Sequence, residues 1–331
     1  MWVSWFTEDD CTTTVVYGEG SKLSISTGTT TLVGDAPYTY THTSRSKWDS
    51  YHPYNSSFIH QVNISGLESN TQYVYKVGGS NGSSVFSTWS SEKTFTTQRL
   101  PGDSAADSTD GSEPLRVTVI GDVGQTEYSK RTVEECLNLT NATYLTHGDV
   151  SPSHLIIVGD LSYADGYGPR WDSWGRLFSP LLSALPLVAF PGNHEIEEDY
   201  ETGEFFMHFR KRFRMPEVAP EYIAHGTVKS YSSYDMDLTY DYGSSFFSYD
   251  AGRAHFICLN LYTHSEKGSA QYKWVVNDLA SVDRSVTPWI FVFVHGPWYN
   301  SNIKHQNEVA TLDMKEAMED LFHGYQVKVY L

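Results

Sequence analysis

Residues 155–165 read LIIVGDLSYAD: four aliphatic residues, then a glycine, an aspartate and, three positions later, a tyrosine. A short aliphatic run that ends in Gly-Asp is typical of a buried strand followed by a turn. In layered α/β folds, ligands bind at the carboxyl ends of the strands. We therefore expect Asp160 and Tyr163 at an edge of a sheet where a ligand binds.

Three other apolar runs end in the same way, at residues 117–120, 187–190 and 289–294. The polar residues that follow these runs are Asp122, Asn193, His194 and His295. Any one of them alone is more often a turn former or a structural residue than a ligand. Together, beside glycines that let the backbone approach an ion, they favour a site of oxygen and nitrogen ligands for first-row metals. Two such ions about 3.5–4 Å apart would clamp both oxygens of a phosphoryl displacement.

The composition is compatible with such a site. The chain has 331 residues, enough for two domains, and a formal net charge of −17. This charge argues against nucleic acid or an anionic membrane surface as the main partner. An anionic substrate would then need a strong local positive charge, which bound cations supply. The sequence contains no apolar run of about 18 residues, so no membrane span is expected.

The pattern of the chain changes twice along its length. Residues 1–98 contain short β-type runs between Gly, Ser, Asn and Asp turns, and residues 66–75 (GLESNTQYVY) resemble the tyrosine corner of a fibronectin type III domain. Residues 99–114 are rich in Pro, Gly, Ser and Asp and are interpreted as a linker. After the linker, apolar strands alternate with helical patterns, including residues 271–282 and 308–322, which indicates α/β layering.

The strand-end motifs resemble those of the calcineurin-like metallophosphoesterase superfamily and, more closely, of the purple acid phosphatases, over nearly the whole chain. The family motifs are Asp-x-Gly, Gly-Asp-x-x-Tyr, Gly-Asn-His-Glu/Asp, a strand-end His and Gly-His-x-His, and the first four are present. Tyr163 is the most specific of these residues, because generic metallophosphoesterases lack it. The resemblance implies a fibronectin type III-like β-sandwich at residues 1–98. It also implies an αββα catalytic domain of two sheets at residues 115–331, incomplete at its carboxyl end.

The same resemblance implies a binuclear metal site. Asp122 and Tyr163 would hold the first metal, and Asp160 would bridge both metals. Asn193 and His295 would hold the second. A phenolate ligand implies Fe(III) as the first ion, with Zn, Mn or Fe(II) as the second. A ferric ion can hold hydroxide at low pH, so the resemblance implies hydrolysis of phosphate monoesters in acid with that hydroxide as the nucleophile.

Further residues would act on the substrate by the same resemblance. His194 would reach the substrate phosphate. Residues 297–305 (PWYNSNIKH) resemble the segment that supplies outer-sphere histidines, and His305 falls where the proton donor to the leaving alcohol stands. Lys304 stands where plant-type relatives often carry a second histidine; it can hold a phosphate oxygen but does not titrate near neutral pH. For His305, a solvated loop histidine is the alternative.

The fifth family motif, Gly-His-x-His, has no counterpart in the chain, and residues 327–331 read as a strand just begun. On this ground we expect a truncated chain with weak metal affinity and little or no activity, whose parent protein is an enzyme. One alternative is a phosphodiesterase or nucleotide pyrophosphatase with the same machinery. Another is a non-catalytic glycoprotein that binds through its β domain.

Five Asn-x-Ser/Thr sequons indicate a secreted or luminal glycoprotein, although the N-terminus lacks the features of a signal peptide. The sequons lie at Asn55, Asn63, Asn81, Asn138 and Asn141. The expected partner is a small phosphate ester, and a homodimer is left open. The three cysteines give no disulfide framework. Four further residues are expected in the core, namely Trp171, Trp174, His255 and Cys258.

Overall fold

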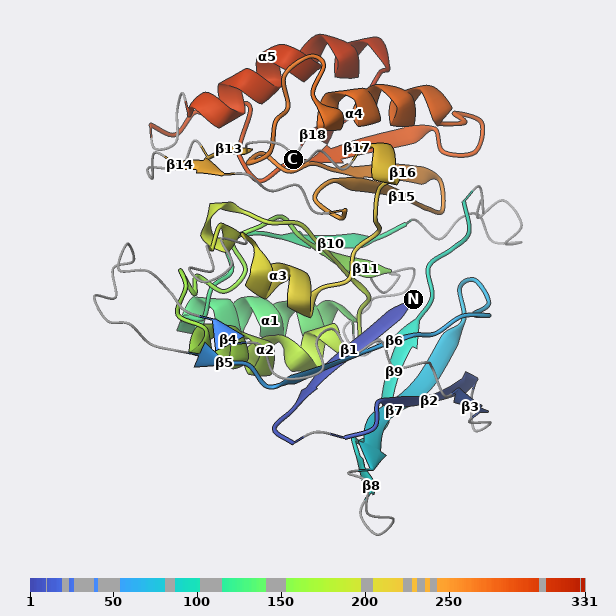
Figure 1. Ribbon diagram of the computed structural model, residues 1–331. Coiled ribbons are helices and arrows are strands. Elements are labelled where there is room, and N and C mark those ends of the chain that lie inside the picture. Colours follow the sequence, from blue (N-terminus) through green and yellow to red (C-terminus); the bar gives the residue numbers. More distant parts are fainter. Residues whose placement is uncertain are drawn as a thin grey trace.

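The computed structural model describes residues 1–9, 11–19, 24–26, 39–40, 54–80, 87–101, 115–140, 153–197, 205–222, 228–230, 236–238, 243–303, 308–327 and 329–330. Figure 1 shows a small strand-rich domain from the N-terminal part of the chain beside a larger layered α/β domain. Most of the predicted linker lies outside the described residues. Among the described helices, none has the length and apolarity needed to cross a bilayer.

The described part of the N-terminal domain is built from antiparallel strands. β1 (Trp2–Thr7) pairs with β6 (Phe58–Asn63), and a second sheet has the order β3–β2–β7–β8, with β9 also paired to β7. The strands of this sheet are β2 (Thr14–Glu19), β3 (Ser24–Ser26), β7 (Gln72–Ser80), β8 (Ser87–Trp89) and β9 (Lys93–Thr96). A separate short pair is formed by β4 (Thr39–Tyr40) and β5 (Tyr54–Asn55).

The two main sheets of this domain share one core. Val3 of β1 and Val62 of β6 belong to the same buried cluster as Val15 of β2 and Phe95 of β9, so the sheets face each other as a sandwich. The cluster also contains Tyr73 of β7.

The predicted tyrosine corner is confirmed. The hydroxyl oxygen of Tyr73 accepts a hydrogen bond from the backbone N–H of Glu68 at 2.9 Å. The chain turns at this point through two residues in the left-handed region, Gly66 with φ 71° and Asn70 with φ 49°. A glycine and an asparagine tolerate this conformation at low cost, which explains their place in the sequence.

The α/β domain contains two sheets. A parallel sheet is formed, in spatial order, by β10 (Val117–Ile120), β11 (His154–Ile157) and β12 (Leu187–Ala189). The second sheet is formed by β15 (Phe247–Ala251), β16 (Ala254–Cys258), β17 (Trp289–Phe293) and β18 (Val329–Tyr330). In it, β15 and β16 are antiparallel, while β16, β17 and β18 are parallel.

Helices cover the outer faces of both sheets, which gives the predicted αββα order (Figure 1). α1 (Glu127–Thr140) and α2 (Pro169–Leu182) lie on the first sheet, and α4 (Ala270–Ser281) and α5 (Val309–Gly324) lie on the second. The two helices predicted from sequence periodicity correspond to α4 and α5. The remaining elements are η3 (Asn193–Glu195), α3 (Met207–Arg212), η4 (Pro220–Tyr222), β13 (Val228–Ser230) and β14 (Met236–Leu238).

Successive strand residues face different layers, as the period of two in a β-strand requires. In β11, Leu155 and Ile157 belong to the buried cluster that includes Trp171 of α2. Ile156, between them, belongs to the cluster between the sheets, together with Phe256. The four residues predicted in the core are buried, namely Trp171, Trp174, His255 and Cys258.

His255 differs from an ordinary core histidine because both ring nitrogens face carboxylates. Its Nδ1 lies 2.6 Å from Asp250 Oδ1 on the neighbouring strand, and its Nε2 lies 2.9 Å from Asp278 Oδ2 on α4. Burial alone would lower the pKa of His255, but the hydrogen bonds and charges of Asp278 and Asp250 outweigh it and raise the pKa above 6.5. The imidazolium therefore links α4 to the sheet.

We predict that His255→Gln lowers the free energy of unfolding by about 1.5–3 kcal/mol at pH 5, the range for hydrogen bonds to charged groups. The folded-state pKa of His255 is raised, so its contribution is fully present below pH 6.5 and is lost as the pH rises through the folded value. Urea unfolding at pH 5, 7 and 9 measures the stability of the variant and of the parent protein. His323→Gln is the control, because His323 is exposed. A His255→Gln effect that did not change with pH would contradict the prediction.

Candidate metal centre

The strand-end residues predicted from the sequence come together at one edge of the two sheets. Because β10, β11 and β12 are parallel, the loops that follow them emerge at the same edge. These loops carry Asp122, Asp160 with Tyr163, and Asn193. The loop after β17 brings His295 from the second sheet.

Their ligand atoms lie close to one another. Asp122, Asp160 and His295 each offer one ligand atom, and these atoms lie within 4.8 Å of one another. The Nε2 of His295 is 3.2 Å from Asn193 Oδ1 and 3.4 Å from Asp160 Oδ1. The hydroxyl of Tyr163 is 3.0 Å from Asp122 Oδ1. The structure thus brings together all five residues that the sequence predicts as metal ligands.

The hydrogen bonds of His295 define which of its nitrogens can bind a cation. Its Nδ1 lies 2.8 Å from the carbonyl oxygen of Val158, which can only accept, so Nδ1 carries the hydrogen. The lone pair of Nε2 in the neutral ring then points toward two further acceptors, Asp160 Oδ1 and Asn193 Oδ1. A proton or a metal cation at this point satisfies all three atoms. A ring held by a backbone carbonyl is the usual orientation of a metal-binding histidine.

The charges of the site also fit a cation. Burial alone would raise the pKa of Asp160, but the hydrogen bond and charge of His295 lower it. In turn, burial alone would lower the pKa of His295, and Asp160 raises it to about 9. Burial and the negative charges of Asp160 and Asp122 raise the pKa of Tyr163. The phenol of Tyr163 therefore keeps its proton unless a cation offsets the two carboxylates.

The loops hold their polar residues in an unusual backbone conformation. Asp122, Asp160, Tyr163 and Asp165 have φ angles of 53°, 52°, 51° and 51°. Non-glycine residues rarely adopt positive φ, and the conformation is most costly for a bulky residue such as Tyr163. Strained residues of this kind cluster at functional sites.

Two glycines allow the loops to approach one another. A Cβ atom at Gly159 would lie 2.6 Å from His295 Nδ1 and 2.7 Å from the backbone of Gly192. A Cβ atom at Gly192 would lie 2.2 Å from Asp160 Oδ1 and 2.8 Å from His295 Cε1. All four distances are shorter than van der Waals contact, so neither Gly159 nor Gly192 has room for a side chain.

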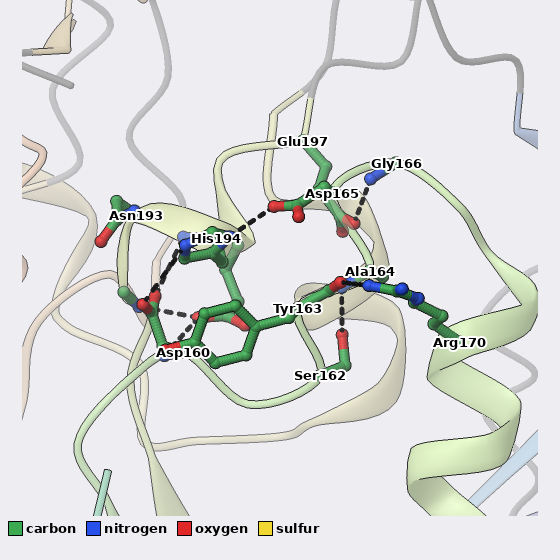
Figure 2. Close-up of polar contacts among 12 residues, drawn as sticks. Asp160, Ser162, Tyr163, Ala164, Asp165, Gly166, Arg170, Asn193, His194 and Glu197 are labelled. Atoms are coloured by element: carbon green, nitrogen blue, oxygen red, sulfur yellow. Dashed lines mark hydrogen bonds and ion pairs between the residues drawn. The ribbon is translucent and has the colours of Figure 1, made fainter. Parts of the chain in front are cut away.

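His194 lies beside this cluster (Figure 2), and 28% of its side chain is exposed. Its backbone N–H donates to Asp160 Oδ1 at 3.0 Å, and its Nδ1 pairs with the carboxylate of Asp165. Its Nε2 lies 3.8 Å from Asp160 Oδ2, and its ring centroid is 4.2 Å from that of Tyr163. Asp165 thus orients the ring of His194.

Sequence reasoning assigned no role to Glu195, which joins the loops of the site. Its buried carboxylate accepts backbone N–H groups from Asp160 at 2.8 Å, Leu161 at 2.9 Å and Gly192 at 2.9 Å. Burial and the charge of Asp160 raise the pKa of Glu195 to about 7. Its place in the Gly-Asn-His-Glu motif was the available signal, but two of its three backbone partners, Asp160 and Leu161, are distant in sequence.

Several predicted residues lie outside the described part of the chain. These are Lys304, His305 and the sequon residues Asn81 and Asn141. Of the remaining sequon residues, Asn55 and Asn63 have exposed side chains and Asn138 is half-buried on α1.

The fold agrees with the comparisons to known proteins. Residues 115–331 match the family model described as calcineurin-like phosphoesterase, and residues 1–97 match that of the purple acid phosphatase N-terminal domain. The chain therefore belongs to the calcineurin-like phosphoesterase family. Within that family, its N-terminal domain and its curated relatives group it with the purple acid phosphatases.

Two curated relatives and one solved structure illustrate the similarity. Probable purple acid phosphatase 20 of Arabidopsis thaliana is 34% identical over 331 residues, which is 99% of this chain and 62% of the relative. Phosphoenolpyruvate phosphatase of Allium cepa is 33% identical over 304 residues, 89% of this chain and 53% of the relative. A purple acid phosphatase from yellow lupin (Lupinus luteus) seeds superposes with a TM-score of 0.74 at 21% identity, covering 99% of this chain and 55% of that chain. The chain thus spans between half and two thirds of these proteins.

We predict that Gly192→Ala destabilises the protein by about 1–3 kcal/mol, because the new Cβ atom displaces Asp160 from His295. Gly175→Ala is the matched control, since a Cβ atom at this position of α2 meets no atom within 4 Å. In the helix interior this change is expected to stabilise by roughly 0.5–1 kcal/mol. Urea unfolding of both variants gives the comparison. Similar stability of the two variants would show that the loops do not depend on the close approach.

Proposed function

We propose that the protein is an acid phosphatase that hydrolyses phosphate monoesters at a binuclear site of Fe(III) and a divalent Zn, Mn or Fe(II) ion. The observation that carries the proposal is the convergence of two carboxylates, a phenol, an amide and an imidazole from four strand ends. The name of the Allium cepa relative, a phosphoenolpyruvate phosphatase, supports a monoester as the substrate class. Because the chain spans 62% of its Arabidopsis thaliana relative, the activity is proposed for the whole protein.

The donor atoms divide between two ions. Asp122 and Tyr163 are proposed to hold Fe(III), since a phenolate and a carboxylate suit a hard trivalent ion. Asp160, the most central carboxylate, would bridge, and Asn193 and His295 would hold the divalent ion. When bound, such a pair of ions polarises the phosphoryl group and activates water in acid.

The residues of the chain itself orient the substrate. The Nδ1 of His194 pairs with the carboxylate of Asp165. Burial alone would lower the pKa of His194, but the hydrogen bond of Asp165 and the charge of Asp160 raise it. In the imidazolium form, the Nε2–H of His194 is proposed to donate to a phosphate oxygen. His305 is proposed to give a proton to the oxygen of the leaving alcohol. Lys304 is proposed to hold a second phosphate oxygen as a point charge.

The domain division and the location of the protein complete the proposal. We assign residues 1–98 to a fibronectin type III-like domain, 99–114 to the linker and 115–331 to the catalytic domain. A secreted or luminal glycoprotein is proposed from the sequons, of which Asn55 and Asn63 present exposed side chains.

The test is metal analysis of the whole protein combined with hydrolysis of para-nitrophenyl phosphate at pH 5. We expect iron and a second metal in near-equal amounts, loss of activity after dialysis against a chelator, and recovery on addition of Fe and Zn. A panel that includes a phosphodiester and a nucleotide pyrophosphate separates the monoesterase from the alternatives. A chelator-resistant activity, or faster cleavage of the diester, would contradict the proposal.

Tyr163→Phe tests the phenolate separately. We expect this variant to lose the visible absorption of a phenolate bound to ferric iron and to lose activity by about 100-fold or more. Removing a partner that only orients a metal ligand already costs about 10- to 100-fold, and Tyr163 is proposed as a ligand itself. Tyr128→Phe is the control, because Tyr128 is 77% exposed on α1. Retention of the visible band in Tyr163→Phe would assign the colour to another residue.

A further inference from the structure

The N-terminal domain contacts the α/β domain at the beginning of α2, through Tyr54 of β5 (Figure 1). Tyr54 is 6% exposed, and its ring packs against Met207 and edge-on against His208 at 5.6 Å between centroids. Its hydroxyl donates to Asp172 Oδ1 at 2.8 Å and accepts from Arg212 Nη2 at 2.9 Å. The side chain of Tyr54 from the small domain is therefore buried against residues of the larger domain.

The ring of Tyr54 rests on the backbone of Gly168, the N-cap residue of α2. A Cβ atom at Gly168 would lie 2.2 Å from Cγ of Tyr54, so the contact requires a glycine. Gly168 also ends the loop of residues 163–168, which begins at Tyr163 and contains Asp165. The contact is thus five residues from the proposed phenolate ligand.

Residues of the first turn of α2 also contact the loop of residues 163–168, directly and through Glu197. Arg170 donates from Nη1 to the carbonyl oxygen of Tyr163 at 2.7 Å (Figure 2). The N–H of Gly166 donates to Glu197 Oε1 at 2.8 Å, and the indole of Trp171 donates to Glu197 Oε2 at 3.0 Å. The loop that carries Tyr163 is therefore fixed to α2 at two points.

A second route leads from the Tyr54 hydroxyl to the same loop. Its partner Arg212 is buried, with the guanidinium carbon 5.4 Å from the ring centroid of Trp171. Trp171 in turn holds Glu197, which accepts the amide of Gly166. The ring and the hydroxyl of Tyr54 thus reach residues 163–168 through different contacts.

We propose that Tyr54 is a positioning residue through which the N-terminal domain holds residues 163–168, and with them Tyr163 and Asp165, in the geometry of the metal centre. The effect on the metal centre rests on the proposed function, whereas the effect on the loop does not. The N-terminal domain is then a structural part of the catalytic site.

The test compares Tyr54→Phe with Tyr75→Phe by amide hydrogen exchange of the whole protein without added metal. Tyr75 donates its hydroxyl to the carbonyl of Ser183 at 2.9 Å, at the other end of α2, so each variant removes an interdomain hydrogen bond to the same helix. In Tyr54→Phe we expect exchange in peptides covering residues 163–168 to rise about 10-fold. In Tyr75→Phe we expect it to stay as in the parent protein.

Gly168→Ala is the second variant, because it disturbs the same contact from the other side. Its new Cβ atom meets the ring of Tyr54, and we expect faster exchange in the same peptides. No change at residues 163–168 in Tyr54→Phe and Gly168→Ala would overturn the proposal. An equal change in Tyr75→Phe would do so as well.

A second test uses the metal-loaded protein, because a purely structural role of Tyr54 would leave the visible absorption and kcat unchanged. We expect Tyr54→Phe to shift the visible absorption maximum and to lower kcat about 3- to 10-fold at unchanged KM, while Tyr75→Phe leaves both as they are. Faster exchange with unchanged kcat and unchanged absorption would overturn the link to the metal centre. If the parent protein itself shows neither colour nor activity, the proposed function fails, and the exchange result still decides whether Tyr54 holds the loop.

Discussion

The hydrogen bond from His295 to the carbonyl of Val158 joins the two sheets of the α/β domain at the point where their strand ends meet. It fixes the neutral ring in one tautomer and turns Nε2 toward Asp160 and Asn193, which follow strands of the other sheet. The bond is possible because Gly159 and Gly192 leave room for the imidazole. The convergence of the site residues and the proposed chemistry depend on this contact between sheets.

The site concentrates negative charge in a chain that is already acidic. Asp160 and Glu195 are buried within hydrogen-bond reach of the same loops, and Asp122 faces the phenol of Tyr163. Glu195 is stabilised there by backbone N–H groups, which supply partial positive charge without a basic side chain. Asp160 and Asp122 have fewer such donors, and this difference distinguishes a carboxylate that organises the loops from carboxylates that are available to a cation.

The strand ends and the layer order could be predicted from the sequence because they depend on local patterns, namely aliphatic runs that end in glycine and a polar residue. The tyrosine corner was predictable for the same reason, since Glu68 and Tyr73 are five residues apart. The role of Glu195 was not, because its amide partners at Asp160 and Leu161 lie more than thirty residues upstream. The carboxylates around His255 illustrate the same limit: its flanking residues are apolar, and Asp278 approaches from a helix.

The left-handed backbone at Asp122, Asp160, Tyr163 and Asp165 has a consequence for attempts to make this protein more heat-resistant. Glycine is the residue that relieves such a conformation, so selection for thermal tolerance alone would favour glycine at these four positions. Each such exchange would remove a carboxylate or a phenol from the site. Engineering for durability therefore has to leave these positions unchanged and seek its gains elsewhere, for example along the exposed faces of α4 and α5.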